Sequence, residues 1–259
     1  LRLAGLPALE EMALSVGAAP ARTLDEELAG RPELGPAAGA AWAYFAPCGP
    51  RYLLPQVGLA TVKVLGALNG RGTPLANPCC GLLSFNYGDL EEARVGARAV
   101  IARFEAAGLP PAVPVVGDCS SCVAFLKSYP QLFLSDPAWR PRAEAFAARV
   151  KDAAEMLPTD KMPKNETLPL MTVHDACRLR HGQGVAAAPR AAMRALAGNG
   201  CAALGRSEHC CGGAGAFAFV HPELSEDLLK AKVAAIADTQ ARLVAASSTS
   251  CLVQLERGL

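Results

Sequence analysis

Short apolar runs alternate with amphipathic segments from residue 41 onward. The run 41–46 is apolar and ends at a Pro-Cys-Gly-Pro turn, which is typical of a buried strand followed by a loop. Residues 56–68 and 90–107 place apolar side chains at helical spacing. The run 112–116 predicts a further strand, and 75–77 a short extended segment. Strands that alternate with helices indicate a parallel sheet with crossover helices.

The same order of elements recurs in the second half of the chain. Apolar runs at 170–173 and 243–246 predict strands, and the segments 190–196 and 224–241 predict helices. A long helix is expected at 140–157, between the two repeats. We therefore predict an α/β fold made of two repeated Rossmann-like half-domains with parallel sheets, related by a pseudo-twofold axis.

The pattern divides the chain into three segments. Residues 1–40 contain one helical stretch at 7–16 and a connector rich in Pro, Gly and Ala, so we interpret them as a lead-in helix and linker. Residues 41–157 are predicted to form the first half-domain with its connecting helix. Residues 158–259 are predicted to form the second half-domain.

The composition is typical of a globular protein without a membrane span. The 259 residues are 51% hydrophobic and 19% charged. No apolar run reaches about 18 residues, the length that indicates a transmembrane helix. The formal net charge of +1 gives no support for nucleic-acid binding, which usually leaves a basic surplus. We expect a cytoplasmic protein, with a peripheral position on the inner face of the membrane as an alternative.

Nine of the ten cysteines belong to one pattern that occurs twice. Cys177, Cys210 and Cys251 follow their counterparts in the first copy by 129, 131 and 129 residues. A fixed internal period is the signature of a duplicated unit. Ser248 stands where the second copy would have the first cysteine of its Cys-x-x-Cys sequence. The cysteines of the two copies are Cys48, Cys79, Cys80, Cys119 and Cys122, and then Cys177, Cys210, Cys211 and Cys251.

These thiols favour a bound soft metal over disulfides. Secreted disulfide proteins are usually short and rich in loops, whereas this chain has long helical segments. Thiolates select zinc, copper(I) or iron–sulfur clusters. A tetrahedral zinc site and an ordinary [4Fe–4S] cube each use four ligands, one fewer than the first copy offers. The neighbours Cys79 and Cys80 reach different metals of a cluster more easily than they reach one ion. The set therefore favours a cluster over mononuclear zinc, at the strand ends where sites form in α/β proteins.

The doubled pattern resembles the cysteine-rich "CCG" domain family over about residues 41–259. Members of this family include the cysteine-rich component of heterodisulfide reductase and the iron–sulfur subunits of glycolate and lactate oxidases. The sequences on which the resemblance rests are Cys79-Cys80-Gly81, Cys119-Ser120-Ser121-Cys122, Tyr129-Pro130, Asp136-Pro137, His174-Asp175-Ala176-Cys177, Cys210-Cys211-Gly212-Gly213-Ala214-Gly215 and Cys251-Leu252.

The resemblance implies electron transfer beside a flavoprotein (FAD) subunit, toward quinone or a disulfide. It implies that the five cysteines of the first half hold a noncubane [4Fe–4S] cluster. The four cysteines of the second half would hold an ordinary cube or no cluster, because Ser248 breaks the set. The family often has a ferredoxin-like segment with Cys-x-x-Cys-x-x-Cys spacing. This sequence does not contain one, so a ferredoxin-like protein or domain is an expected partner, together with a membrane subunit on the quinone side.

Two histidines and one further cysteine have candidate roles. His174 and His209 lie close in sequence to ligand cysteines, so they are candidates for proton donors or for hydrogen bonds that tune a cluster. Their alternative is a purely structural role. Cys201 lies outside the repeated pattern, and a lone cysteine is more often a small buried residue than a ligand.

Three functions fit these observations. The first is an iron–sulfur electron-transfer subunit of a flavin-dependent oxidoreductase complex of the 2-hydroxy-acid oxidase or heterodisulfide reductase type. The second is a zinc-stabilised or cluster-free scaffold subunit. The third is a thiol–disulfide reductase that cleaves a disulfide directly at a noncubane cluster. No catalytic residue is assigned from the sequence.

Overall fold

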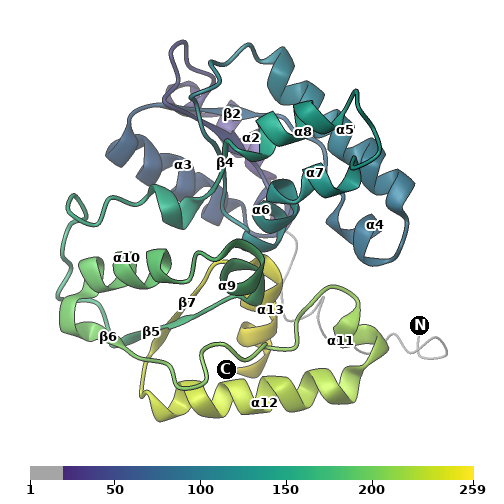
Figure 1. The fold of residues 1–259 in the computed structure, drawn as a ribbon. Helices are drawn as coiled ribbons and strands as arrows, with labels where there is room; N and C mark the ends of the chain where they lie inside the picture. Colours follow the sequence, from purple (N-terminus) through teal and green to yellow (C-terminus); the bar gives the residue numbers. More distant parts are fainter. Residues whose placement is uncertain (1–19) are drawn as a thin grey trace. The chain divides into compact units, whose positions relative to one another are not determined.

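The structure is a computed structural model that describes residues 20–259, so the helix expected at 7–16 lies outside the described residues. Residues 20–157 form one compact unit, and residues 158–259 belong to a second unit. The first is drawn in purple to teal and the second in green to yellow (Figure 1). No helix in the described part of the chain is both long enough and apolar enough to cross a lipid bilayer.

The first unit contains the elements expected of the first repeat, together with one further strand and several short helices. In chain order they are α2 (Leu24–Ala29), η2 (Pro32–Leu34), β1 (Trp42–Phe45), η3 (Gly49–Leu53), α3 (Pro55–Asn69), β2 (Gly72–Leu75), α4 (Leu82–Asn86), α5 (Leu90–Ala106), β3 (Val115–Gly117), α6 (Ser120–Lys127), α7 (Tyr129–Leu132), α8 (Arg140–Ala147), β4 (Val150–Asp152) and η4 (Ala153–Met156).

The four strands of the first sheet are parallel and lie in the order β2-β1-β3-β4. The chain passes from β1 to β2 on one side and then returns past β1 to β3. The direction of winding therefore reverses between β1 and β3. In an open parallel sheet, the strand ends on either side of such a reversal leave a crevice where ligands bind.

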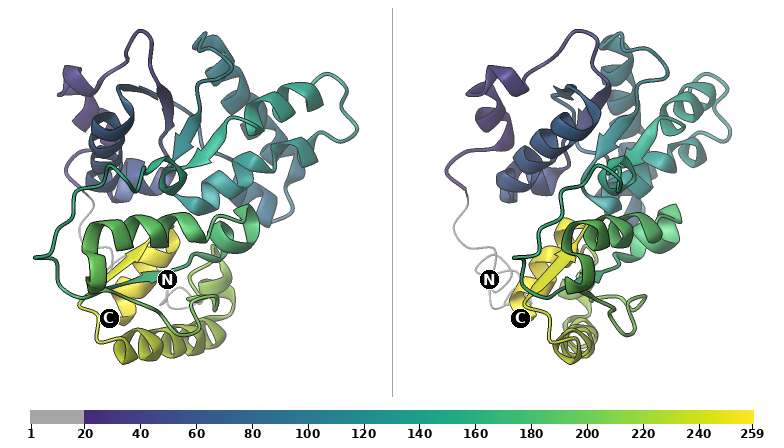
Figure 2. Two further views of the ribbon diagram at one scale, coloured as in Figure 1. Left: turned by 60° about the vertical axis from the view of Figure 1, so that its left-hand side comes forward. Right: turned by 90° about the vertical axis from the view of Figure 1, so that its left-hand side faces the viewer.

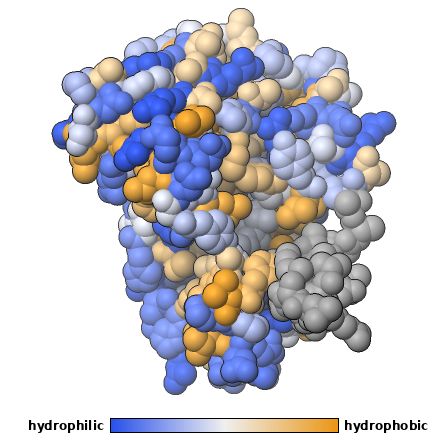
Figure 3. Space-filling model, turned by 90° about the vertical axis from the view of Figure 1, so that its right-hand side faces the viewer, coloured by the Kyte–Doolittle hydropathy of each residue, from blue (hydrophilic) through white to orange (hydrophobic). Residues whose placement is uncertain are grey.

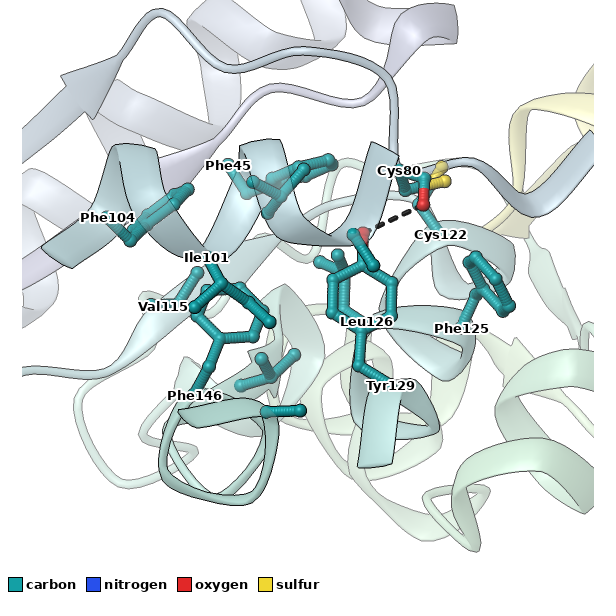
Figure 4. Packing of buried hydrophobic residues seen from close by; sticks show 14 of the residues in the cluster. Phe45, Cys80, Ile101, Phe104, Val115, Cys122, Phe125, Leu126, Tyr129 and Phe146 are labelled. Carbon is teal, nitrogen blue, oxygen red and sulfur yellow. Dashed lines mark hydrogen bonds between the residues drawn. The ribbon is translucent and has the colours of Figure 1, made fainter. Parts of the chain in front are cut away.

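Helices cover both faces of the first sheet (Figures 1 and 2). Successive side chains of a strand point to opposite faces, and all of β1 is buried. Trp42 and Tyr44 pack against α2 and α3, whereas Ala43 and Phe45 pack against α5 and α6. The Phe45 and Phe104 rings stack with their centroids 6.4 Å apart (Figure 4). A strand buried on both faces explains why 41–46 is a continuous apolar run.

The second unit contains a shorter version of the same arrangement. In chain order its elements are β5 (Met171–His174), α9 (Cys177–Gln183), α10 (Ala187–Ala197), η5 (Gly198–Gly200), β6 (Cys201–Ala202), α11 (Phe217–Val220), α12 (Pro222–Asp238), β7 (Leu243–Ala246) and α13 (Thr249–Gly258).

The second sheet repeats the topology of the first, in the order β6-β5-β7 with parallel pairing throughout. The central strand β5 corresponds to β1. Helix α10 covers one face of the sheet, and α12 lies on the other face with α13 beside it (Figures 1 and 2). The predicted fold class, two repeated Rossmann-like half-domains with parallel sheets, is confirmed.

The long helix predicted at 140–157 is wrong beyond Ala147. Helix α8 ends there, and Val150–Asp152 pair with the edge of β3. The side chains of this segment are buried, exposed and buried in turn, which is the period of a strand and not of a helix. Asp152 then begins η4, where its side chain accepts the backbone N–H of Ala154 at 3.1 Å.

Residues 20–40, predicted as part of a linker, contribute a helix to the first unit. Leu24 and Leu28 of α2 are buried in the same cluster as Trp42. Thr23 begins this helix with a capping box, in which its hydroxyl accepts the Glu26 N–H and the Glu26 carboxylate accepts the Thr23 N–H. The first core therefore extends to the amino side of β1.

Alanine substitutions at two glycines, one in β2 and one in α3, are expected to change the free energy of unfolding in opposite directions. A Cβ at Gly72 would lie 2.3 Å from the fully buried ring of Trp42. We expect Gly72→Ala to lower the free energy of unfolding by about 1–3 kcal/mol through overpacking. Gly66, inside α3, has open space at its Cβ position, so Gly66→Ala should raise it by about 0.5–1 kcal/mol. Urea denaturation followed by circular dichroism measures both, and a stabilising Gly72→Ala would contradict the packing described.

Candidate metal centres

Three cysteines of the first unit lie where its central strands end. Cys48 follows β1 and begins η3, Cys79 follows β2, and Cys119 follows β3 and begins α6. The Sγ atoms of Cys48 and Cys79 are 3.9 Å apart. The parallel topology therefore brings thiols from three separate loops to one edge of the sheet.

The five thiols of the first unit have a buried side and an exposed side. Cys80, Cys119 and Cys122 are buried within the larger hydrophobic cluster, and the other two thiols are exposed. The buried hydroxyl of Tyr129 donates a hydrogen bond to the Cys80 carbonyl oxygen at 2.8 Å (Figure 4). This bond fixes the backbone of the Cys-Cys pair against the core.

The thiols of the first unit interact directly with one another. Hydrogen bonds from Cys48 and from Cys80 lower the pKa of Cys79 to about 2. Hydrogen bonds with Cys119, Cys48 and Cys80, together with burial, raise the pKa of Cys122 well above its usual range. One thiolate is thus stabilised by its neighbours, whereas further deprotonation brings like charges together in a poorly solvated place. A bound cation removes this conflict, because it takes deprotonated thiols as ligands and compensates their charge.

Asn77 holds the ends of β1 and β2 together, and the sequence analysis missed it. The amide is buried; its Oδ1 accepts the Ala46 N–H at 2.8 Å and its Nδ2 donates to the Ala46 carbonyl at 3.1 Å. Because Ala46 and Asn77 each lie two residues before a cysteine, these bonds set the spacing of Cys48 and Cys79. The Asn77-Pro78 dipeptide is a turn signal in the sequence, but the partners of the Asn77 amide depend on the fold.

A buried carboxyl group lies beside the thiols at the end of β3. The Oδ2 atom of Asp118 accepts hydrogen bonds from the hydroxyls of Tyr44 and Thr61, both at 2.8 Å. Burial raises the pKa of Asp118 to about 7, although these hydrogen bonds oppose the rise. The network links β1, α3 and the end of β3 at the reversal of the sheet, and so it positions Cys119 at the start of α6.

The second unit gathers its cysteines in the same way. Cys177 begins α9 just after β5, and Cys251 lies in the first turn of α13 after β7. Cys210 and Cys211 come from the segment between β6 and α11, and the Gly212 N–H donates to the Cys210 Sγ at 3.3 Å. Hydrogen bonds from Cys177 and Cys211 lower the pKa of Cys210 to about 2. The second set of thiols therefore also meets at one place.

The structure adds His174 to this second set. Its side chain is 1% exposed, and the ligand atoms of His174, Cys211 and Cys251 all lie within 4.8 Å of one another. Neither ring nitrogen forms a hydrogen bond of acceptable geometry within the described residues. A hydrogen bond from Cys211, and then the nearby imidazole, lower the pKa of Cys251 to about 6 although burial opposes this. The sequence shows that His174 is close to Cys177 along the chain, but it does not show that the imidazole lies beside the thiols of Cys211 and Cys251.

Buried charged groups surround the second set of thiols. Lys232 of α12 is 2% exposed, and its Nζ donates to the Arg206 carbonyl at 2.7 Å. Burial lowers the pKa of Lys232, and the nearby thiols oppose this. Asp175 is also buried; it pairs with Arg190 and, at 3.3 Å, with Arg180. The second centre thus has a buried amine beside it and a carboxylate compensated by two guanidinium groups.

Three other residues singled out from the sequence lie as follows. Ser248 is buried at the start of α13, with its Oγ 3.3 Å from the Oγ of Ser250. The side chain of His209 is 54% exposed, with its Nε2 3.8 Å from Glu208. Cys201 begins β6 and pairs with the first residue of β5, at the sheet edge opposite to the one where the thiols gather.

The Cys-Cys-Gly turns need glycine for close backbone approach. Gly81 and Gly212 have φ angles of +85° and +84°, a region that other residues rarely adopt. A Cβ at Gly212 would lie 2.6 Å from the Ser225 carbonyl oxygen, and one at Gly81 would lie 3.3 Å from that of Ala93. The glycines therefore allow the cysteine pair to lie directly against α5 and α12.

Sulfur is the common donor at both centres, with one imidazole added in the second. None of the ten cysteines forms a disulfide within the described residues. A soft donor set with exposed and buried members, gathered at strand ends, fits a metal or an iron–sulfur cluster.

Comparison with known families agrees with this arrangement. The family model described as a cysteine-rich domain, CCG, matches residues 42–127 and 171–256. The first match runs from β1 to the end of α6, and the second from β5 through most of α13. Each match contains all the gathered cysteines of its unit, and together the two matches cover more than half of the chain.

Curated relatives have similar sequences over most of this chain. A lactate utilization protein A from Exiguobacterium sp. is 33% identical over 222 residues, which cover 82% of this chain and 87% of the relative. A probable glycolate oxidase iron-sulfur subunit from Bacillus subtilis is 30% identical over 84% of this chain, which spans about half, 49%, of that relative. A lactate utilization protein A from Bacillus velezensis is 29% identical over 77% of this chain and 84% of the relative.

Removing the Asn77 amide is expected to loosen the first centre. In Asn77→Ala the buried N–H and carbonyl of Ala46 lose their partners, so the free energy of unfolding should fall by about 2 kcal/mol. Asn69→Ala is the matched control. Asn69, the last residue of α3, donates a single hydrogen bond, at 2.8 Å, to the carbonyl oxygen of Met156 in η4. Urea denaturation of both variants makes the comparison. Equal losses in the two would contradict a special role for Asn77.

Proposed function

The chain belongs to the family of cysteine-rich (CCG) domain proteins, and on that premise we propose that it is an iron–sulfur electron-transfer subunit of an oxidoreductase complex that oxidises a 2-hydroxy acid. The observation that supports this most is the gathering of sulfur donors at the strand ends of a parallel sheet, once in each unit. The relatives named for lactate utilization and glycolate oxidation support lactate or glycolate as the class of substrate.

Each unit offers a separate place for a cluster. The five thiols of the first unit would hold a [4Fe–4S] cluster of the noncubane type, and the four of the second unit would hold another cluster. Such a group supplies the uptake and release of one electron at a time. The buried thiols of Cys80, Cys119 and Cys122 would hold it in the apolar core, while Cys48 and Cys79 keep one side near the surface. Hydrogen bonds to the sulfurs would tune its potential.

The electron balance indicates the partners. A 2-hydroxy acid loses two electrons and two protons when it becomes a 2-oxo acid, and a flavin accepts both electrons together. A carrier of single electrons delivers this pair in two transfers to an acceptor, quinone or a disulfide, that takes up two electrons and two protons. We therefore propose an FAD-containing donor subunit, a ferredoxin-like iron–sulfur protein or domain as a further carrier, and a quinone-side acceptor subunit at the inner face of the membrane.

Apolar side chains are exposed on the helix that follows the first Cys-Cys-Gly turn. Leu83 and Phe85 of α4 and Tyr87 after it are 53%, 38% and 59% exposed. Figure 3 views the side of the chain on which α4 lies and shows hydrophobic residues interspersed with hydrophilic ones. Exposed apolar groups a few residues after the exposed Cys79 are typical of a surface that contacts a partner.

A zinc-stabilised scaffold is the second candidate function. It is favoured by one observation, the group of His174, Cys211 and Cys251, since structural zinc sites combine cysteine with histidine. The five thiols of the first unit oppose it, because a tetrahedral ion leaves one of them without a role.

Replacing Cys80 by serine should empty the first centre. The anaerobically purified wild-type chain should contain about eight iron and a similar amount of sulfide if both centres hold four-iron clusters. Cys80→Ser should reduce both to about half, because a hydroxyl is a poor ligand for a soft metal. Metal analysis by mass spectrometry, sulfide determination and EPR of the reduced protein measure this.

Cys201→Ser is the matched control for that experiment. Cys201 lies in the second sheet, at the end of the strands opposite to the one where the thiols of that unit gather. Its replacement should therefore leave the iron and sulfide content unchanged. Unchanged iron in Cys80→Ser would contradict the five-thiol centre. Zinc in place of iron, without sulfide, would exclude the electron-transfer function and favour the scaffold.

A further inference from the structure

The sets of candidate donor residues in the two centres differ by two exchanges at equivalent positions. The two matches to the family model begin at residues 42 and 171 and have equal length, so β1 aligns with β5 at an offset of 129 residues. At this offset Ser248 takes the place of Cys119, and His174 takes the place of Phe45. The second unit therefore lacks one thiol and has one imidazole in addition.

The two exchanged positions lie at the carboxyl ends of neighbouring strands of the second sheet. In the parallel pairing of β5 with β7, His174 lies opposite Ala246. Ser248 follows Ala246 by two residues and begins α13. The additional imidazole is therefore near the place from which the thiol is missing.

The imidazole has a different environment from the ring that it replaces. Phe45 packs in the hydrophobic core against Phe104 and needs no polar partner. His174 is just as deeply buried, but neither ring nitrogen forms a well-aligned hydrogen bond among the described residues, and the imidazole interacts with the nearby thiol of Cys251 instead. Burying a polar group without a good hydrogen bond costs free energy, and this cost falls when one ring nitrogen binds a metal. The thiols of Cys211 and Cys251 lie close enough to share such a metal, because the ligand atoms of the three residues all lie within 4.8 Å of one another.

We propose that His174 is a metal ligand of the second centre, where its imidazole nitrogen takes the coordination place for which Ser248 provides no thiol. The other ligands are Cys177, Cys210, Cys211 and Cys251. The inference rests on the proposed function in one respect, that the metal is the iron of a cluster. It goes further by assigning a mixed nitrogen and sulfur donor set to this unit and an all-sulfur set to the first.

A mixed donor set changes the electrostatics of the second centre. A neutral imidazole in place of a thiolate removes one negative charge from the ligand set, and this raises the reduction potential of iron–sulfur centres. The buried Lys232 acts in the same direction, because its amine interacts with the thiols of Cys210 and Cys211. The second centre should therefore hold an electron more tightly than the first.

Pulsed EPR of the reduced full-length chain tests the assignment. We expect hyperfine coupling from a directly bound nitrogen, and its isotopic shift when histidine is labelled with nitrogen-15. His174→Phe installs the residue of the first unit, so it should abolish this coupling and reduce iron and sulfide to about half. His181→Gln is the control, since His181 is an exposed residue of α9, and it should change neither quantity.

A double exchange tests the compensation and guards against misfolding of the single variant. The chain with His174→Phe and Ser248→Cys has the donor set of the first unit in the second. It should regain full iron and sulfide without any nitrogen coupling. Recovery shows that the loss in His174→Phe comes from a missing ligand and not from damage to β5.

Each outcome separates the ligand assignment from the function. Wild-type protein that contains iron and sulfide but shows no nitrogen coupling would overturn the assignment and leave the proposed function intact. A wild-type chain with about four iron atoms, and the same iron content in His174→Phe, would also overturn the ligand assignment, since the second centre would then hold no cluster. Absence of both iron and sulfide from the wild-type chain would instead overturn the proposed function, and the assignment with it.

Discussion

The arrangement of both centres depends on one topological constraint, the reversal of winding beside the central strand of each parallel sheet. Because β1 and β5 are flanked on both sides by parallel partners, the loops that follow three strands leave the sheet at the same edge. Cysteines that are far apart in sequence meet at this edge because the strands before them are neighbours in the sheet. The apolar runs that build the strands are therefore what positions the thiols.

Charge balance is the second constraint. Thiols that share protons within hydrogen-bond distance stabilise one thiolate and oppose the next, which is why the pKa of Cys79 falls while that of Cys122 rises. The two units relieve this crowding differently. The first leaves two of its thiols exposed to solvent. The second places Lys232 and His174 within its buried surroundings.

The sequence was sufficient for features that depend on local pattern. The strands 41–46 and 170–173, the helix 90–107 and the register of the cysteine repeats follow from periodicity and spacing. The strand β4 was missed because its three residues gain their structure from pairing with β3 and have no local signal. Asn77 and Lys232 were missed for a related reason. Their roles depend on which backbone groups and thiols the fold brings near them.

The asymmetry of the two units has a physical consequence for electron transfer. Two identical centres would share an electron equally, and nothing within the chain would favour transfer in one direction. A centre whose ligands carry less negative charge, near a buried amine, holds the electron more tightly than its all-thiolate counterpart. The substitution of serine for cysteine at position 248 therefore does not by itself indicate a decayed half. With the ligation proposed for His174, the two exchanges together would make the second unit the more favourable destination for an electron.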